Sequence, residues 1–230
     1  NVFLKSPVDI FVCGDVDIFW FEQQIKLMFE NIEVADSHYP KTIIVKAVQE
    51  VKNITETEQI VQGKLSLGFR TKIEPTDARY PALMMYNAVL GNGVFSKLFN
   101  NVREKLSLAY YASSNMEYLK GIMTINSGIE VQNYQKAFDE IMFQMNEIKN
   151  GNITDNELSA AKLGTINTLK SLTDNPYYLE DYYLGKLVTG QIIEIDELTE
   201  LVTSITKEQI VSISNDIELD TVYFLKGSEA

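Results

Sequence analysis

Histidine and cysteine are almost absent from this sequence of 230 residues, which contains one residue of each type, His38 and Cys13. A protein zinc site takes three or four ligands, mostly cysteine, histidine or carboxylate groups, and these two residues cannot form such a cluster. A Ser/His/Asp or Cys/His catalytic set also needs His38, which lies in the polar, proline-containing segment DSHYPK. We therefore expect no metal ligand and no catalytic residue in this chain, and we interpret His38 as a solvated loop residue.

Long hydrophobic runs and an excess of basic residues are also missing. No apolar run approaches the roughly 18 residues that a membrane-spanning helix needs, so we expect no membrane partner. The chain has 20 Lys and Arg residues against 32 Asp and Glu residues, a net charge of −12. Because this charge repels phosphate backbones, we expect no nucleic-acid partner. A lone cysteine forms no internal disulfide, which fits a reducing compartment or simply a buried small hydrophobic residue, and we expect the cytoplasm.

Large side chains, in contrast, are abundant and periodic, and 45% of the residues are hydrophobic. From Gln59 onward the patterns predict one strand, two helices, two strands, five helices and a final strand. The strands are IVQGKLSLGFR, LAYYASSNMEYL, GIMTINSGIE and LDTVYFLKG, and the helices begin near Thr76, Phe95, Tyr134, Thr154, Asn175, Asp196 and Thr206. This order predicts an α+β fold in which helices cover one side of a mainly antiparallel sheet.

The first 58 residues have a less regular pattern. The segment VDIFVCGD alternates like a strand, and helical spacing of apolar residues follows it from Ile18 to Phe29. Residues 31–58 are mixed and charged, and they contain Pro40 and one short apolar run, TIIVKAV. We predict a strand and a helix in residues 1–30, a linker with a possible strand over 31–58, and one compact unit over 59–230. Since the sequence starts without an initiator methionine, we expect it to be a fragment of a longer protein.

The segment from Ala88 to Ser114, AVLGNGVFSKLFNNVREKLSLAYYASS, resembles the signature of the pitrilysin/insulinase family of zinc metallopeptidases. That family includes the mitochondrial processing peptidases, and its pattern runs L-G-G-G, then S-R-L-F, then R-E-K-x-x-L-A-Y. The matching residues are Leu90-Gly91, Gly93, Ser96, Leu98-Phe99, Arg103-Glu104-Lys105 and Leu108-Ala109-Tyr110, and the departures are Asn92, Val94-Phe95, Lys97 and Tyr111. A match of this length is more specific than a lone glycine motif, although the departures bring the flexibility of the glycine loop into question.

The resemblance implies a metallopeptidase half-domain of the LuxS/processing-peptidase-like type, one of two or four similar halves that enclose a chamber. In the family, zinc is held by an H-x-x-E-H helix of a catalytic half, and that motif does not occur in this sequence. Residues 59–230 then correspond to a C-terminal non-catalytic half, and residues 1–30 to the end of a preceding half. We expect the chain to be inactive alone, with zinc in an upstream catalytic half or in a partner chain of a homo- or heterodimer.

The resemblance also implies two substrate-binding residues, because a non-catalytic half of this family supplies an Arg and a Tyr that hold the bound peptide. By position these are Arg103 and Tyr110. From the residues alone, α-helical spacing predicts a buried stripe formed by Phe95, Leu98, Phe99, Val102 and Leu106. Arg103 lies at the border of that stripe, where its guanidinium group can reach carboxylates or carbonyls. Tyr110 shares its predicted strand face with Ala112 and Met116, so a core tyrosine with one hydrogen bond remains an alternative.

Other interpretations stay open at this point. The chain can be the non-catalytic half of an active bacterial-type peptidase, or a catalytically inactive structural or interaction subunit that pairs with an active partner. An unrelated α+β binding domain is a third alternative. The tyrosine-rich run NPYYLEDYYLGKLV can line a peptide-binding wall, but we favour ordinary helix packing, because Tyr178 and Tyr182 are four residues apart beside Leu179 and Leu187.

Overall fold

The structure is a computed structural model, and it describes residues 8–32, 43–45, 47–190 and 193–227. The helices are α1 (Ile18–Phe29), α2 (Tyr80–Leu90), the π-helix η2 (Leu98–Lys105), α3 (Tyr134–Lys149), α4 (Asp155–Ser171), α5 (Pro176–Thr189), α6 (Ile195–Ser204) and α7 (Lys207–Ile213). The strands are β1 (Lys52–Glu58), β2 (Gly63–Arg70), β3 (Ala109–Glu117), β4 (Ile122–Ile129) and β5 (Glu218–Gly227). Short 3₁₀ turns are η3 (Tyr118–Lys120), η4 (Val131–Asn133) and η5 (Leu172–Asp174).

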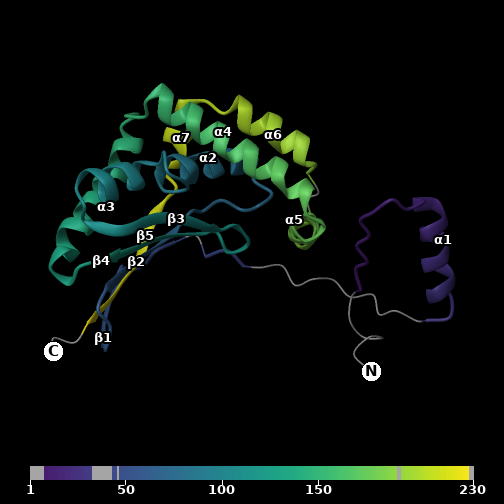
Figure 1. Ribbon diagram of the computed structural model, residues 1–230, viewed down its shortest axis with the longest axis horizontal. Coiled ribbons are helices and arrows are strands. Elements are labelled where there is room, and N and C mark those ends of the chain that lie inside the picture. The colour runs from purple at the N-terminus through teal and green to yellow at the C-terminus, as the bar shows by residue number, and fades with distance from the viewer. Residues whose placement is uncertain (1–7, 33–42, 46, 191–192, 228–230) are drawn as a thin grey trace.

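The five strands form one sheet in the order β1-β5-β2-β4-β3. All neighbouring pairs are antiparallel except β1 and β5, which are parallel. From β2 to β5 the chain therefore follows the predicted order of one strand, two helices, two strands, five helices and a strand, and the predicted α+β class is confirmed. Most of the helices lie on one side of the sheet (Figure 1).

The core lies between this sheet and the helices. Strand β2 alternates strictly, with Leu65, Leu67 and Phe69 buried on the helical side. Alternation of this kind is what a half-covered strand requires, because successive side chains point to opposite faces. Helix α2 supplies the densest layer of the core, and nine of its residues are buried. The helical cover thus places α2 directly over the sheet, beside strand β3.

Local sequence signals define the ends of the later helices. Thr154 and Glu157 form a reciprocal capping box at the start of α4, and Thr206 and Gln209 form a second one at the start of α7. Gly190 ends α5 in the left-handed conformation, with φ of 73°, which favours glycine. These signals explain why the five-helix segment is predictable from the sequence.

Strand β1 lies within the segment 31–58, which we predict as a linker with a possible strand, but it follows the apolar run TIIVKAV and belongs to the sheet. Residues Lys52–Glu58 pair in parallel with β5, with Lys52 opposite Thr221 and Glu58 opposite Gly227. Every residue of β1 is exposed. An edge strand whose two faces are both exposed to solvent needs no alternation of apolar and polar residues. The sequence KNITETE therefore has no hydrophobic pattern from which the strand could be predicted. The sheet therefore begins at Lys52 rather than at Gln59.

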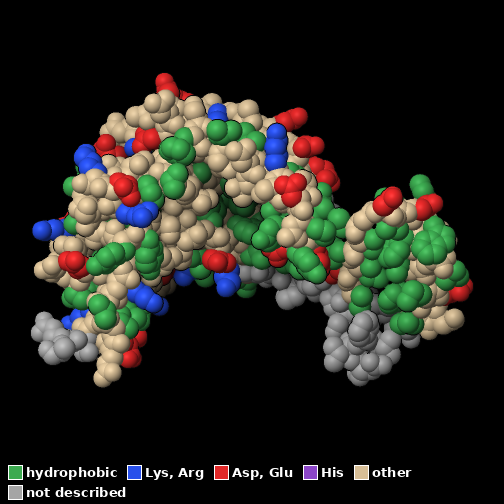
Figure 2. Space-filling model, viewed as in Figure 1, with side chains coloured by type: hydrophobic (Ala, Val, Ile, Leu, Met, Phe, Trp, Pro, Cys, Tyr) green, Lys and Arg blue, Asp and Glu red, His purple; other side chains and the backbone are tan. Residues whose placement is uncertain are grey.

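The N-terminal segment also differs in part. The described residues 8–16 form no strand, whereas the predicted helix is present as α1, capped by the Asp17 side chain, which accepts from Trp20 N at 3.0 Å. A strand needs a partner strand, and none lies beside this segment among the described residues. No residue of α1 is buried, and its Phe19 and Ile18 are 81% and 76% exposed. Figure 2 shows hydrophobic side chains gathered on this helix. No helix among the described residues has the length and apolar character that crossing a membrane requires.

Candidate functional site

Arg103 lies on η2, an eight-residue π-helix that precedes β3. Its wider winding is visible in the bond from Leu106 N to Asn101 O, which spans five residues at 3.1 Å. The predicted buried stripe is wrong in part, because this helix begins only at Leu98, after Phe95, and does not have α-helical spacing. Leu98 and Val102 are buried, but Phe95 and Leu106 are 66% and 45% exposed. Because π-helical turns are rare and often occur at functional sites, η2 is a candidate location for a functional residue.

The Arg103 guanidinium is largely available for binding. Its central carbon lies 4.7 Å from the centre of the Phe99 ring, a cation–π contact that holds the plane of the group. Its ion pair with Glu104 joins Nε and Oε1 at 3.5 Å, which is longer than a good hydrogen bond. Among the described residues, no hydrogen-bond acceptor contacts its two terminal amino groups. Arg103 therefore presents a fixed planar donor fork to solvent.

Tyr110 lies in a β-bulge and is 60% exposed, so the alternative of a core tyrosine is wrong. The pairing of β3 with β4 shifts between Ala109 and Tyr111, which face Ile129 and Gly128. A bulge adds one residue and breaks the alternation of faces. Tyr110 therefore does not share a face with Ala112, contrary to the prediction, and its hydroxyl has no partner among the described residues.

Arg103 and Tyr110 line one shallow depression with a volume of about 390 Å³. Glu130 and Asn133 contribute polar groups from the opposite side, and Ser107 lies in the turn between η2 and β3. Ser107 has φ of +50°, a left-handed conformation that is uncommon for residues other than glycine. Such strained positions are found preferentially at functional sites. The two sequence-predicted residues thus line the same depression.

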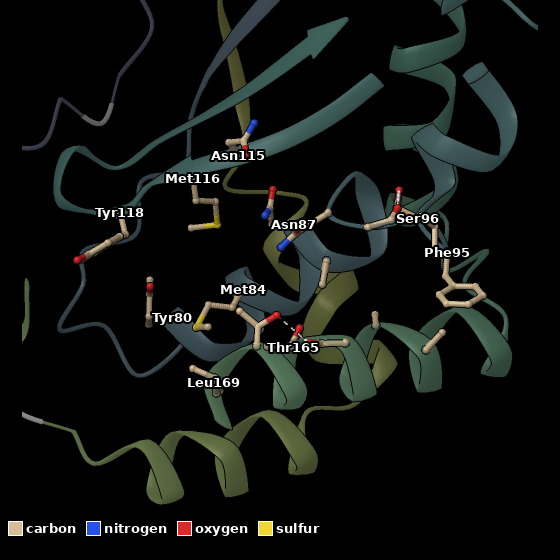
Figure 3. A pocket seen from close by; sticks show the side chains of 18 of the residues that line it. Tyr80, Met84, Asn87, Phe95, Ser96, Asn115, Met116, Tyr118, Thr165 and Leu169 are labelled. Atoms are coloured by element: carbon tan, nitrogen blue, oxygen red, sulfur yellow. Dashed lines mark hydrogen bonds between the residues drawn. The ribbon is translucent and has the colours of Figure 1, made fainter. Parts of the chain in front are cut away.

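The glycine loop between α2 and η2 is held firmly rather than loosely. Ser114 N of β3 donates to Gly91 O at 3.0 Å, and Ser96 Oγ donates to Gly93 O at 2.7 Å. Phe95, next to Ser96 on this loop, has an exposed ring. The ring lies at the edge of a cavity that Asn87 and Met116 also line (Figure 3). The substitutions that set this loop apart from the family pattern therefore lie on a rigid, anchored turn.

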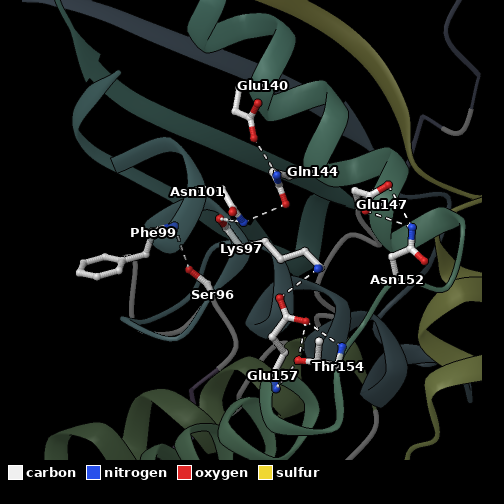
Figure 4. A network of polar contacts seen from close by, with 10 residues as sticks. All are labelled: Ser96, Lys97, Phe99, Asn101, Glu140, Gln144, Glu147, Asn152, Thr154 and Glu157. Atoms are coloured by element: carbon white, nitrogen blue, oxygen red, sulfur yellow. Dashed lines mark hydrogen bonds and ion pairs between the residues drawn. The ribbon is translucent and has the colours of Figure 1, made fainter. Parts of the chain in front are cut away.

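A polar network fixes the start of η2 to α3 and α4 (Figure 4). Lys97 is 6% exposed, and its Nζ lies 2.9 Å from Glu157 Oε1. Asn101 Nδ2 donates to Lys97 O at 3.0 Å and to Gln144 Oε1 at 3.1 Å. Burial raises the pKa of Glu157, but hydrogen bonds from Thr154 and Lys97 outweigh it, so the pKa is lowered and the carboxylate stays charged. The network therefore positions the helix that carries Arg103.

The tyrosine-rich run forms part of α5 and divides into two pairs. Tyr182 donates to Ile193 O at 2.8 Å and Tyr183 donates to Glu194 Oε2 at 2.6 Å, so these two hold the segment that follows α5. Tyr177 and Tyr178 are 79% and 59% exposed. Helix packing thus accounts for Tyr182, whereas Tyr178 does not pack as we predict.

The residues of this chain do not fit a zinc ion. Among the described residues, no group of three or more His, Cys, Asp or Glu side chains is arranged to hold a metal. Cys13 is a free, exposed thiol, and His38 lies outside the described residues. We therefore derive no chemical step through a metal bound to this chain.

Two residues beside the site have roles that we do not predict from the sequence. Phe99, expected in the buried stripe, supports the Arg103 guanidinium, and Ser107 has the strained turn conformation. A Phe and an Arg four residues apart on a helix are neighbours, so their spacing is a signal that could have identified the first pair. Ser107 carries no such signal, because its conformation is imposed by the junction of η2 and β3.

Comparison with known proteins relates this chain to a group of peptidases. The profile of the family described as "Peptidase M16 inactive domain" matches residues 3–164. The "Probable inactive metalloprotease YmfF" of Bacillus subtilis is 35% identical over 230 residues, which cover 98% of this chain and 53% of that protein. The "Uncharacterized zinc protease YmxG" of the same organism is 25% identical over 169 residues, which cover 72% of this chain and 41% of that protein. The chain thus spans about half the length of the curated relatives it matches.

Solved structures show the same fold. A conserved protein from Enterococcus faecalis superposes with a TM-score of 0.84 at 30% identity, over 98% of this chain and 53% of that one. A peptidase M16 inactive domain from Pseudomonas fluorescens gives a TM-score of 0.74 at 18% identity, over 91% of this chain and 52% of its own. The architecture described above is therefore shared by M16-like proteins.

Proposed function

The chain belongs to the peptidase M16 family as an inactive domain, and on that premise we propose that it is the non-catalytic C-terminal half of a zinc metallopeptidase. In this proposal it completes a chamber for peptide substrates. The zinc ion is supplied by a catalytic half, either upstream in the same protein or in a partner chain of a homo- or heterodimer. Relatives named zinc proteases that are about twice as long support this arrangement. The cytoplasm remains the proposed location, since the exposed thiol of Cys13 suits a reducing compartment.

The observation that carries the proposal is that Arg103 and Tyr110 line the same depression. An extended peptide offers backbone carbonyl oxygens, which are acceptors. The guanidinium group can donate two parallel hydrogen bonds to such groups or to a carboxylate, and the phenol can donate one. Phe99 and the network around Lys97 hold the guanidinium in place before the peptide arrives. The chain therefore contributes to binding and orienting the peptide, not to its hydrolysis.

The exposed apolar face of α1 is compatible with the same arrangement. Side chains such as Phe19, Trp20 and Met28 are more than half exposed, and exposed apolar groups gathered on one helix are typical of an interaction surface. We propose that residues 1–30 belong to the preceding half and that the part of the chain between them and β1 connects the two halves.

A catalytically inactive subunit is the second candidate function. The observation that favours it is the 35% identity to a protein named a probable inactive metalloprotease. In that case the peptide is bound by this chain but cleaved only when an active partner joins it, or not at all. Zinc analysis and peptidase assays on the complete parent protein discriminate between the two candidates.

Arg103→Lys and Tyr110→Phe should each weaken peptide turnover by the assembled peptidase. Lys keeps the charge but loses the planar fork, and Phe keeps the ring but loses the donor. Loss of one charged or transition-state hydrogen bond costs about 1 to 3 kcal/mol, or roughly 5-fold to 150-fold in kcat/KM. Tyr111→Phe is the matched control, since this exposed neighbour lies outside the depression and should retain full turnover. If both variants keep wild-type turnover at unchanged stability, the proposed role of the pair is wrong.

The isolated chain should bind no stoichiometric zinc, because its one histidine and one cysteine cannot supply three ligands and a general base. The measurement is elemental analysis after zinc loading and dialysis, together with a peptidase assay. One tightly bound zinc ion per chain, with peptidase activity that a chelator abolishes, would contradict the assignment as a non-catalytic half.

A further inference from the structure

A separate cavity lies at the opposite end of β3 from Arg103 and Tyr110. It has a volume of about 710 Å³ and lies between α2, the glycine loop, the end of β3 and α4. Figure 2 shows it as a hollow with hydrophobic side chains at its back. Its volume falls in the range of pockets that hold small molecules or short peptide segments. The cavity is separate from the depression described above, and the proposed function does not use it.

The walls of this cavity are mainly apolar and leave room for a ligand. Met84 of α2, Met116 of β3 and Leu169 of α4 face into it (Figure 3), and methionine adapts to varied apolar partners. On α4, a Cβ added at Gly164 would meet no atom within 4 Å. Phe95 stands at the rim with 66% of its surface exposed. An exposed aromatic ring beside an apolar hollow is a typical anchor for a bound partner.

Asn87 is the unusual residue of the cavity. It is 8% exposed, and its Oδ1 is buried without any hydrogen-bond partner. No described residue donates to or accepts from either polar atom of its carboxamide. A buried polar atom without a partner destabilises the folded state, so an apolar residue would be the better choice for a purely structural role. The carboxamide offers one donor and one acceptor, and rotation about its terminal bond selects which of them faces a ligand.

We propose that this cavity is a second peptide subsite, which binds two or three apolar residues of an extended peptide through the Asn87 carboxamide. The inference rests on the proposed peptide-binding function and deepens it. A carboxamide can pair with a main-chain amide, because its NH2 group donates to the peptide carbonyl oxygen and its carbonyl oxygen accepts from the peptide N–H. Asn115 and Thr165 add further polar groups at the opposite walls, while the apolar walls accept the side chains.

The position of the cavity along β3 gives the subsite a defined distance from Arg103. From Tyr110 to Glu117 the strand advances about 23 Å, at roughly 3.3 Å for each residue. A peptide must therefore have about seven extended residues to reach both sites. It cannot simply extend the sheet along β3, because Gly91 O already accepts from Ser114 N in the middle of this edge. The peptide thus enters the cavity beside the glycine loop, next to Phe95.

The test titrates the nitrogen-15-labelled 230-residue chain with acetyl-Phe-Leu-Phe-amide, a neutral peptide too short to reach both sites. We expect saturable shifts of the Asn87 side-chain and Gly164 backbone resonances. Gly164→Leu fills the open space on α4 and should weaken binding about tenfold or more. Gly164→Ala adds a single methyl group in the same place and should bind the peptide nearly as well as the wild type. Unmoved cavity resonances, or equal binding by the Leu and Ala variants, would overturn the proposal.

A second variant separates a ligand-binding role of Asn87 from a structural one. Asn87→Leu removes the unpaired buried oxygen, so the melting temperature should stay equal or rise, while tripeptide binding weakens about fivefold. A lower melting temperature with unchanged binding would show that Asn87 is structural and would refute its assigned role. Turnover by Arg103→Lys and Tyr110→Phe reports on the other site. The failure of the subsite and the failure of the proposed function are therefore observed in different experiments.

Discussion

Replacing Lys97 by Met should lower the free energy of unfolding by about 3 kcal/mol, because it leaves the Glu157 carboxylate without its cation. The Lys97 side chain is 7% exposed and that of Glu157 is 19% exposed, so water compensates only weakly for the lost ion pair. Glu157 also accepts from Thr154 N at 2.8 Å and caps α4. The measurement is chemical denaturation monitored by circular dichroism at neutral pH.

The pH dependence of this loss has a definite sign. In the wild-type chain the pKa of Glu157 is lowered, so its stabilising contribution is present above the unfolded pKa and is lost as the pH falls through the folded one. In Lys97→Met that pKa rises, so the variant and the wild type should converge in acid, where the carboxyl is protonated in both. A difference in stability that does not shrink below about pH 4 would contradict the electrostatic explanation.

Two further variants serve as controls for Lys97. Lys207→Met removes a comparable but exposed pair, since Lys207 Nζ lies 3.3 Å from Asp155 Oδ1 and the Asp155 side chain is 95% exposed. We expect that change to cost less than about 1 kcal/mol, as surface pairs do. Lys97→Met combined with Glu157→Gln should recover part of the loss, because no unpaired charge then remains buried.

Replacing Gly91 by Ala should lower the free energy of unfolding by about 3 kcal/mol or more. A Cβ at this position would lie 2.5 Å from Ser114 N, 2.7 Å from Ser114 Oγ and 2.8 Å from Leu98 Cδ1. The first of these is a backbone atom of β3, which cannot rotate away as a side chain can. The loop must therefore move and release the bond from Ser114 N to Gly91 O. Thermal unfolding of the purified variant measures the effect.

The control for Gly91 adds the same methyl group where space is open. Gly164→Ala in α4 should raise stability by up to about 1 kcal/mol, because alanine favours helix and nothing obstructs its Cβ. Equal stability of Gly91→Ala and the wild type would mean that the glycine loop is looser than the contacts with Ser114 and Leu98 indicate. Glycine at position 91 is thus explained by the close approach of Ser114 and Leu98 to its Cα, and not by a need for a flexible backbone.

The candidate site was predictable as a pair of residue positions but not as a geometry. The motif resemblance pointed to Arg103 and Tyr110, whose binding role remains a proposal, and the irregular backbone around them did not follow from the periodicity. Helix η2 winds as a π-helix, Phe95 lies in the loop before it, and the bulge moved Tyr110 out of the core. Both irregularities arise where η2 meets β3, and no repeating pattern of apolar residues encodes such a junction.

The sequence by itself determined the order of elements from β2 to β5, because each of those elements carries its own local signal. Alternation marks β2, and reciprocal capping by Thr154 and Glu157 marks α4. Only the tertiary structure decided that Lys52–Glu58 joins the sheet, that Lys97 meets Glu157, and that Asn87 is left unpaired beside an open cavity. These features depend on contacts between segments far apart in the chain, which local propensity and periodicity do not record.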